Sequence, residues 1–156
     1  IMVVLVILGI TMTFATLGFQ RLEDDRLEKQ AGHLSAWLQA ISDDAVLDSA
    51  VYGVWLTTDG KKLESAYFMA NRWWSISGDN ANSEALDEGV EIALDSAEGW
   101  KKLTAVAAEE IERVPAMVFL PTGLAQPEKL QLKGSDNRIA LIERDDDGLF
   151  TWSIQQ

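Results

Sequence analysis

The sequence IMVVLVILGITMTFATLGFQ, residues 1–20, contains no charged side chain, whereas the 13 Lys and Arg and the 25 Asp and Glu all follow it. An α-helix rises about 1.5 Å per residue, so about 20 residues span the roughly 30 Å hydrocarbon core of a bilayer. Helices of soluble proteins seldom keep polar groups off every face, and a secretory signal needs a short apolar stretch and a small-residue cleavage site. We therefore predict a helix that crosses a membrane once.

An apolar stripe continues this helix beyond residue 20. Apolar residues recur at steps of three and four, Trp37 and Ala40 widen the stripe, and polar side chains such as Ser35 and Gln39 lie opposite. There is no proline before residue 115. We predict one helix to about Asp48, with a length of about 70 Å. The stripe residues, which we expect to pack on the rest of the chain, are Leu27, Ala31, Leu34, Leu38, Ile41 and Ala45.

Short strands are predicted for the rest of the chain. The runs 51–56 and 61–70 flank Asp59-Gly60, which is a strong hairpin signal, and residues 71–89 are polar and mostly loop. Residues 101–113 are ambiguous between helix and strand. The last third predicts an antiparallel meander. The predicted strands after residue 89 are 90–94, 116–120, 128–133, 138–144 and 149–154.

The composition excludes several classes of function. The chain has 156 residues, a formal net charge of −12, one His and no Cys. A nucleic-acid partner would need a basic surface, and thiolate or two-imidazole metal sites lack their ligands. The acidic run Asp145–Gly148 lacks the later acidic ligand of a calcium loop, so we expect a turn there. We expect no enzyme, with no catalytic, metal-binding or cofactor-binding residue and no cofactor.

Several motifs resemble one family of membrane-anchored subunits. The run Ile1–Ile10 looks like the N-terminal segment of type IV pilins and type II secretion pseudopilins. The segments LQAISDDAVL (38–47), Tyr52-Gly53-Val54, the Asp59-Gly60 hairpin and VFLPTG (118–123) narrow the resemblance to minor pseudopilins of the H type and their pilus relatives. Residues 71–113 contribute little to it.

The resemblance implies an α+β, pilin-like fold, in which a long N-terminal helix with a transmembrane half and an amphipathic half packs on antiparallel β-sheets. Residues 1–20 would form the transmembrane or filament-core half, and residues 21–156 a periplasmic globular domain. The family's cleavage site, N-methylated first residue and conserved glutamate are expected just upstream of Ile1. The protein would be a single-pass protein of the bacterial inner membrane.

The resemblance also implies a structural role. Such a subunit sits near the tip of the periplasmic pseudopilus that drives protein export through a type II secretion system. Its partners would be other minor pseudopilins and the major pseudopilin, with the inner-membrane platform and the exported substrate as further candidates. The alternative is a minor pilin of a type IV pilus, with a role in assembly, adhesion or DNA uptake, although the negative charge counts against DNA.

Two groups of residues are candidates for contacts with membrane or partners. Trp73 and Trp74 are adjacent, so in an extended segment they point to opposite faces, one toward the core and one toward a partner. We assign Trp55, Trp100 and Trp152 to the core. The candidate membrane and filament-core residues are Ile1, Val3, Val4, Leu5, Val6, Ile7, Leu8, Ile10, Phe14 and Leu17.

Overall fold

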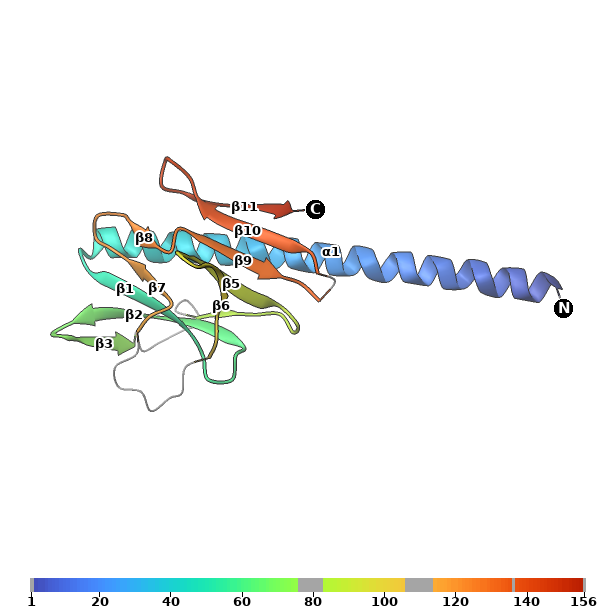
Figure 1. Ribbon diagram of the computed structural model, residues 1–156, viewed down its shortest axis with the longest axis horizontal. Coiled ribbons are helices and arrows are strands. Elements are labelled where there is room, and N and C mark those ends of the chain that lie inside the picture. Colours follow the sequence, from blue (N-terminus) through green and yellow to red (C-terminus); the bar gives the residue numbers. More distant parts are fainter. Residues whose placement is uncertain (1, 76–82, 106–113, 136, 156) are drawn as a thin grey trace.

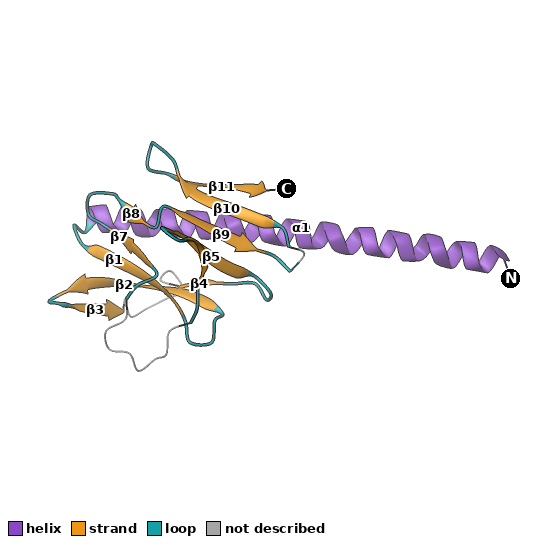
Figure 2. Cartoon of the chain, in the orientation of Figure 1, coloured by secondary structure: helices purple, strands orange, loops and turns teal. Residues whose placement is uncertain are grey.

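One long helix lies along two antiparallel β-sheets, and its N-terminal part extends beyond them (Figure 1). The computed structural model describes residues 2–75, 83–105, 114–135 and 137–155, and the side chains of the helix from Asp25 onward. The two sheets and the C-terminal half of the helix together form the globular part (Figure 2).

Helix α1 runs over Met2–Leu47, so it ends one residue before the predicted boundary. Its uninterrupted length follows from the absence of proline, which would remove a backbone donor and clash with the preceding turn. At its end, Ser49 adopts a left-handed backbone with φ of 53°. The amide of Ala50 then donates to the carbonyl of Ala45 at 3.1 Å, so the chain turns directly into the first strand.

The first sheet contains the predicted hairpin. Strands β1 (Val51–Leu56) and β2 (Lys62–Met69) pair antiparallel, and Gly60 takes a φ of +70° in the turn between them. The sheet order is β3-β2-β1-β7-β8, with β4 pairing β2. The remaining strands are β3 (Arg72–Ser75), β4 (Ser83–Ala85), β7 (Met117–Phe119) and β8 (Ala125–Gln126).

The second sheet contains the predicted meander. Strands β9 (Lys129–Lys133), β10 (Ile139–Arg144) and β11 (Phe150–Gln155) pair in succession, and each pair is antiparallel. The sheet order is β11-β10-β9-β5-β6, so β11 and β6 are its two edges. Strands β5 (Glu91–Ser96) and β6 (Gly99–Lys102) form a hairpin on the far side of β9.

The predicted loop over residues 71–89 is wrong at two places. Strand β3 follows a two-residue turn in which Ala70 and Asn71 have φ values of 52° and 63°. Two positive φ values are typical of a type I′ hairpin turn, which usually carries Asn-Gly, so Ala-Asn gives little signal in the sequence. Strand β4 lies in the same interval. The ambiguous segment is strand over residues 101–102, while residues 106–113 lie outside the described residues.

The core lies between the helix and both sheets. From α1 it includes Leu34 and Leu38, from the first sheet Val54 and Phe119, and all four are at most 1% exposed. The rings of Phe119 and Phe150 lie 6.0 Å apart, so the two sheets meet under the helix. Burial of these side chains, at about 25 cal/mol per Å² of apolar surface, is the main favourable term that holds the helix on the sheets.

Candidate functional site

The apolar stripe of α1 faces the sheets. All six stripe residues are at most 4% exposed, and the adjacent Trp37 is 9% exposed. The prediction that Ala40 also widens the stripe is wrong, because Ala40 is exposed. They contact both sheets, because α1 packs on β1 and β7 of the first sheet and on β10 and β11 of the second. The stripe residues are Leu27, Ala31, Leu34, Leu38, Ile41 and Ala45.

Uncharged polar side chains also hold the helix against the strands. Ser35 Oγ donates to the carbonyl of Phe150 at 2.7 Å, and the amide of Phe150 donates to Gln39 Oε1 at 3.0 Å. At the other sheet, Gln30 Nε2 donates to the carbonyl of Ala85 at 2.9 Å, and Gln30 Oε1 accepts from the amide of Asp87 at 2.8 Å. These bonds satisfy backbone groups that the sheets leave unpaired.

The prediction that Ser35 and Gln39 lie on the solvent face is therefore wrong. Ser35 is 5% exposed and Gln39 is half-buried. The face of α1 that docks is wider than its apolar stripe, because β11 presents backbone groups as well as side chains to the helix. Periodicity of apolar residues cannot reveal such contacts, and the signal that remains is the lack of charge at both positions.

The N-terminal half of the helix is described only by its backbone, which is helical from Met2. The ten candidate membrane and filament-core residues lie between Ile1 and Leu17, outside the described side chains. Among the residues whose side chains are described, no helix has both the length and the hydropathy that a membrane crossing requires.

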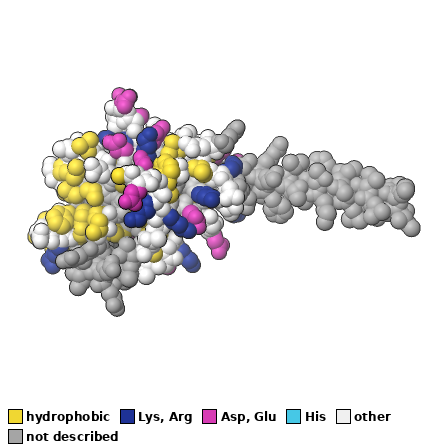
Figure 3. Space-filling model, in the orientation of Figure 1, with side chains coloured by type: hydrophobic (Ala, Val, Ile, Leu, Met, Phe, Trp, Pro, Cys, Tyr) yellow, Lys and Arg dark blue, Asp and Glu magenta, His cyan; other side chains and the backbone are white. Residues whose placement is uncertain are grey.

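The two adjacent tryptophans have different surroundings. Trp73 packs edge-on against Trp55, with ring centroids 4.9 Å apart, and against Phe68 at 5.0 Å. Trp74 lies outside this group: its Nε1 donates to the carbonyl of Met69 at 3.0 Å, and the Arg72 guanidinium lies 3.8 Å from its ring centroid. We call Trp55, Phe68 and Trp73 the aromatic cluster. Hydrophobic side chains gather at the end of the globular part far from the N-terminal half of α1 (Figure 3).

Two of the three tryptophans assigned to the core are not buried. Trp55 is 7% exposed, but Trp100 is 45% and Trp152 is 41% exposed. Both lie on the edge strands of the second sheet, β6 and β11, where one side of the strand has no neighbouring strand within the part of the chain that the structure describes. The sequence alone does not distinguish an edge strand from a central one, so the assignment failed there.

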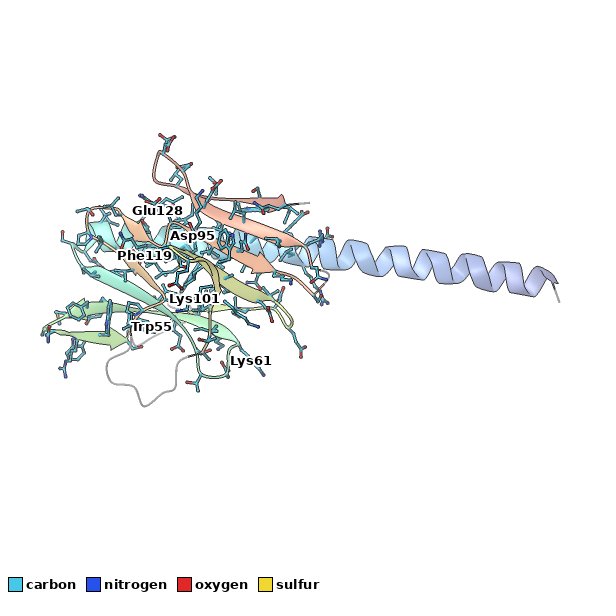
Figure 4. The ribbon with its side chains drawn as sticks, in the orientation of Figure 1. Trp55, Lys61, Asp95, Lys101, Phe119 and Glu128 are labelled. Atoms are coloured by element: carbon cyan, nitrogen blue, oxygen red, sulfur yellow. The ribbon has the colours of Figure 1, made fainter. Side chains whose placement is uncertain are left out.

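A cleft with a volume of about 320 Å³ opens between the two sheets. Its lining includes Trp55 from β1, Asp95 from β5 and Lys101 from β6 (Figure 4). Pro115, on the approach to β7, also lines it. The lining contains no His or Cys, and Ser96 Oγ donates to the carbonyl of Gly99. No group of three metal-ligating His, Cys, Asp or Glu side chains occurs within the described parts of the chain.

The groups with shifted pKa values lie at several places in the described parts of the chain, and each shift has a local cause. Burial raises the pKa of the Tyr52 hydroxyl, and the hydrogen bond that it donates to Asp48 at 2.5 Å raises it further. Partial burial raises the pKa of Asp44, as do the neighbouring carboxylates of Asp48 and Asp43. Burial also raises the pKa of Glu84, with His33 acting in the opposite direction. None of these groups pairs an acid with a base in the cleft between the sheets.

The fold and the docked helix can be compared with known proteins. No family model and no curated protein sequence matches the chain. A solved structure of the minor pseudopilin EpsH from the type 2 secretion system of Vibrio cholerae covers 83% of this chain and 96% of its own, with a TM-score of 0.59 and 16% identity. A crystal structure of the same protein covers 83% and 93%, with a TM-score of 0.58 and 19% identity.

The chain has a fold similar to that of EpsH. The predicted resemblance to minor pseudopilins is therefore confirmed for the fold, as is the prediction of one helix packed on antiparallel sheets. The similarity extends to nearly the whole of the EpsH chains, so it concerns a complete architecture rather than a shared hairpin.

Proposed function

We propose that this chain is a minor pseudopilin of the H type, a structural subunit of the pseudopilus of a type II secretion system. The observation that carries the proposal is the fold similarity to EpsH, which covers 83% of this chain. The uncharged residues 1–20 support it independently, because a filament subunit stored in a membrane needs such a segment. The role requires no catalytic group and no cofactor.

Residues 1–20 act both as the membrane anchor and as the filament-core contact, and residues 21–156 form the periplasmic domain. A helix that is apolar on all sides suits lipid and the interior of a helical bundle equally, so transfer between them changes the free energy little. Left in water, the same helix would cost tens of kcal/mol, at roughly 25 cal/mol per Å² of apolar surface. The helix therefore leaves the bilayer only when neighbouring helices replace the lipid.

Trp74 is the better candidate of the two tryptophans for a contact with another subunit. Trp73 already packs within the aromatic cluster, so its ring is needed for the fold. The Trp74 ring is covered on one face by Arg72 and is only half-buried. Tryptophan and arginine are enriched among the residues that dominate binding energy at protein interfaces. The other minor pseudopilins and the major pseudopilin are the expected partners.

Co-purification tests the proposal. The full chain, tagged at its C-terminus, is expressed with the pseudopilins of one secretion operon, extracted in mild detergent and purified by the tag. We expect the other minor pseudopilins and the major pseudopilin to co-purify. Trp74→Ala should lower their recovery, whereas Trp100→Ala, an exposed tryptophan on β6, should leave it unchanged. Recovery of minor pilins of a type IV pilus in place of pseudopilins would favour the alternative role.

A further inference from the structure

Strand β11 forms an edge of the second sheet, and among the described residues β10 is the one strand that pairs with it. The hairpin between them closes where the amide of Asp145 donates to the carbonyl of Leu149 at 2.9 Å. Bonded and non-bonded residue pairs alternate along an antiparallel ladder. Thr151 and Ser153 therefore bond to β10, while the backbone groups of Phe150, Trp152 and Ile154 point away from it.

Side chains of α1 bond to the first of these outward-facing residues, Phe150. Gln39 accepts from the Phe150 amide and Ser35 donates to the Phe150 carbonyl, as the alternation requires. The two N–H and two C=O groups at Trp152 and Ile154 have no hydrogen-bond partner within the described parts of the chain. They form an open register to which an extended backbone can bond.

Beyond Phe150, where α1 covers the edge, the sequence of β11 carries none of the residues that normally protect an edge strand. Natural edge strands are short or carry charged residues or proline, which prevent pairing with other chains. The sequence of β11, FTWSIQ, has six residues without a charge or a proline, in a chain whose net charge is −12. The opposite edge, β6, has four residues and carries Lys101 and Lys102. The second sheet is therefore protected at one edge and open at the other.

A groove beside β11 can receive a side chain of an added strand. It has a volume of about 500 Å³ and no charged residue in its lining. Its floor on α1 includes Gly32 and Ala36, and the Trp152 indole borders it. The position that a Cβ would take on Gly32 lies 3.5 Å from Trp152 Nε1, so glycine keeps this end of the groove open.

We propose that β11 binds an extended, uncharged strand of a different protein by strand addition. The added backbone bonds to Trp152 and Ile154, and an apolar side chain of the strand enters the groove over Ala36. Main-chain bonds supply affinity in such complexes, and alternate side chains supply specificity. The open backbone register identifies the occupant as a strand, and the uncharged groove identifies it as apolar on that face.

A second copy of the chain does not fit this edge if the proposed membrane anchor is correct. Strand β11 runs opposite to α1 (Figure 1). A symmetric, antiparallel pair of β11 strands would place Trp152 opposite Ile154 of the other copy and would point the two α1 helices in opposite directions. Two copies anchored in one membrane cannot adopt that arrangement. This exclusion rests on the proposed function, whereas the open register does not.

Amide hydrogen exchange tests the strand addition. The probe is a synthetic peptide unrelated to this chain that alternates valine and threonine over seven residues, with two added lysines at each end for solubility. It is mixed in excess with the full isotope-labelled chain in detergent micelles. We expect the exchange rates of the Trp152 and Ile154 amides to fall by at least about tenfold, because new hydrogen bonds protect them. The exchange rates of Thr151 and Ser153 should change little. A control peptide with proline at two adjacent central positions, which lacks the backbone donors that the added strand needs, should have no effect.

Matched substitutions on α1 test the groove. Ala36 and Ala40 are both exposed, but only Ala36 lines the groove. Ala36→Lys should raise the peptide concentration needed to slow the exchange by at least about tenfold. Ala40→Lys should leave that concentration unchanged. Unchanged exchange at Trp152 and Ile154 under saturating peptide would overturn the proposal. Slow exchange that depends on chain concentration without peptide would assign the edge to a second copy instead. Either result would leave the pseudopilin role to be decided by co-purification.

Discussion

At Gly53 the first sheet has space for a hydrogen atom but not for a methyl group. A Cβ at this position would lie 2.8 Å from the Trp55 ring and 2.9 Å from both Pro115 and the Trp73 ring. These three side chains close over β1 on the side away from the helix. Gly53→Ala should therefore lower the free energy of unfolding by about 1–3 kcal/mol, the usual cost of overpacking. Urea unfolding of the full chain in detergent, followed by tryptophan fluorescence, measures it.

Gly32→Ala is the matched control for Gly53→Ala. At Gly32 the nearest atom to a new Cβ is at 3.5 Å, which is ordinary van der Waals contact, and the residue lies inside a helix. Alanine should raise the free energy of unfolding there by about 0.5–1 kcal/mol, because glycine loses more conformational freedom on folding. Equal effects of the two substitutions on the free energy of unfolding would show that crowding at Gly53 does not cause the destabilisation of Gly53→Ala.

Asp44 makes the stability of the chain depend on pH. It lies in the last turn of α1, and its pKa is raised above 3.8 by partial burial and by Asp48 and Asp43. The folded chain therefore binds this proton more tightly than the unfolded chain, so the ionised carboxylate lowers stability at neutral pH. This loss of stability disappears as the pH falls through the pKa that Asp44 has in the folded chain and on toward 3.8.

Asp44→Asn should accordingly stabilise the chain at neutral pH by about 0.3–1 kcal/mol, because it also removes a negative charge from the negative end of the helix dipole. The gain should shrink as the pH falls and vanish below 3.8, where the wild-type carboxyl is neutral in both states. Unfolding curves at several pH values give the comparison. A gain that stays constant down to that pH would exclude the carboxylate as its source.

At the scale of the elements, the docking of α1 decides whether the two sheets form one domain. Leu34 is fully buried between helix and sheets, and Leu47, on the same helix, is 80% exposed. Leu34→Ala should lower the free energy of unfolding by about 2–5 kcal/mol through lost burial and a cavity. Leu47→Ala should change it by less than about 0.5 kcal/mol. Denaturant unfolding of both variants tests this, and similar losses would mean that the helix does not dock through its apolar stripe.

The sequence predicted the elements whose signals are local. The helix end at Leu47 and the turn at Gly60 follow from apolar periodicity and from Asp-Gly between two strands. Strand β3 was not predicted, because Ala70 and Asn71 form a left-handed turn without the glycine that usually marks one. The hydrogen bond from Ser35 to Phe150 and the exposure of Trp152 depend on where β11 lies in the sheet. Strand order is a long-range property, and residue periodicity does not contain it.

At the scale of the whole molecule, the charge distribution divides the chain into two parts. All charged residues follow residue 20, and the proposed function assigns the uncharged segment before them to lipid or to the helices of neighbouring subunits. One continuous helix joins the uncharged segment, from Met2 onward, to the docked half of α1.

A charge placed in the uncharged segment should disrupt both anchoring and assembly. A lysine near the centre of a membrane helix costs about 2.5–3.5 kcal/mol, and an unpaired one buried among neighbouring helices is also unfavourable. Val6→Lys should therefore reduce retention in carbonate-washed membranes and abolish co-purification with the other pseudopilins. Leu47→Lys, which adds the same charge at an exposed position of α1, should do neither. A Val6→Lys chain that is retained and still assembles would refute the assignment of residues 1–20 as membrane anchor and filament core.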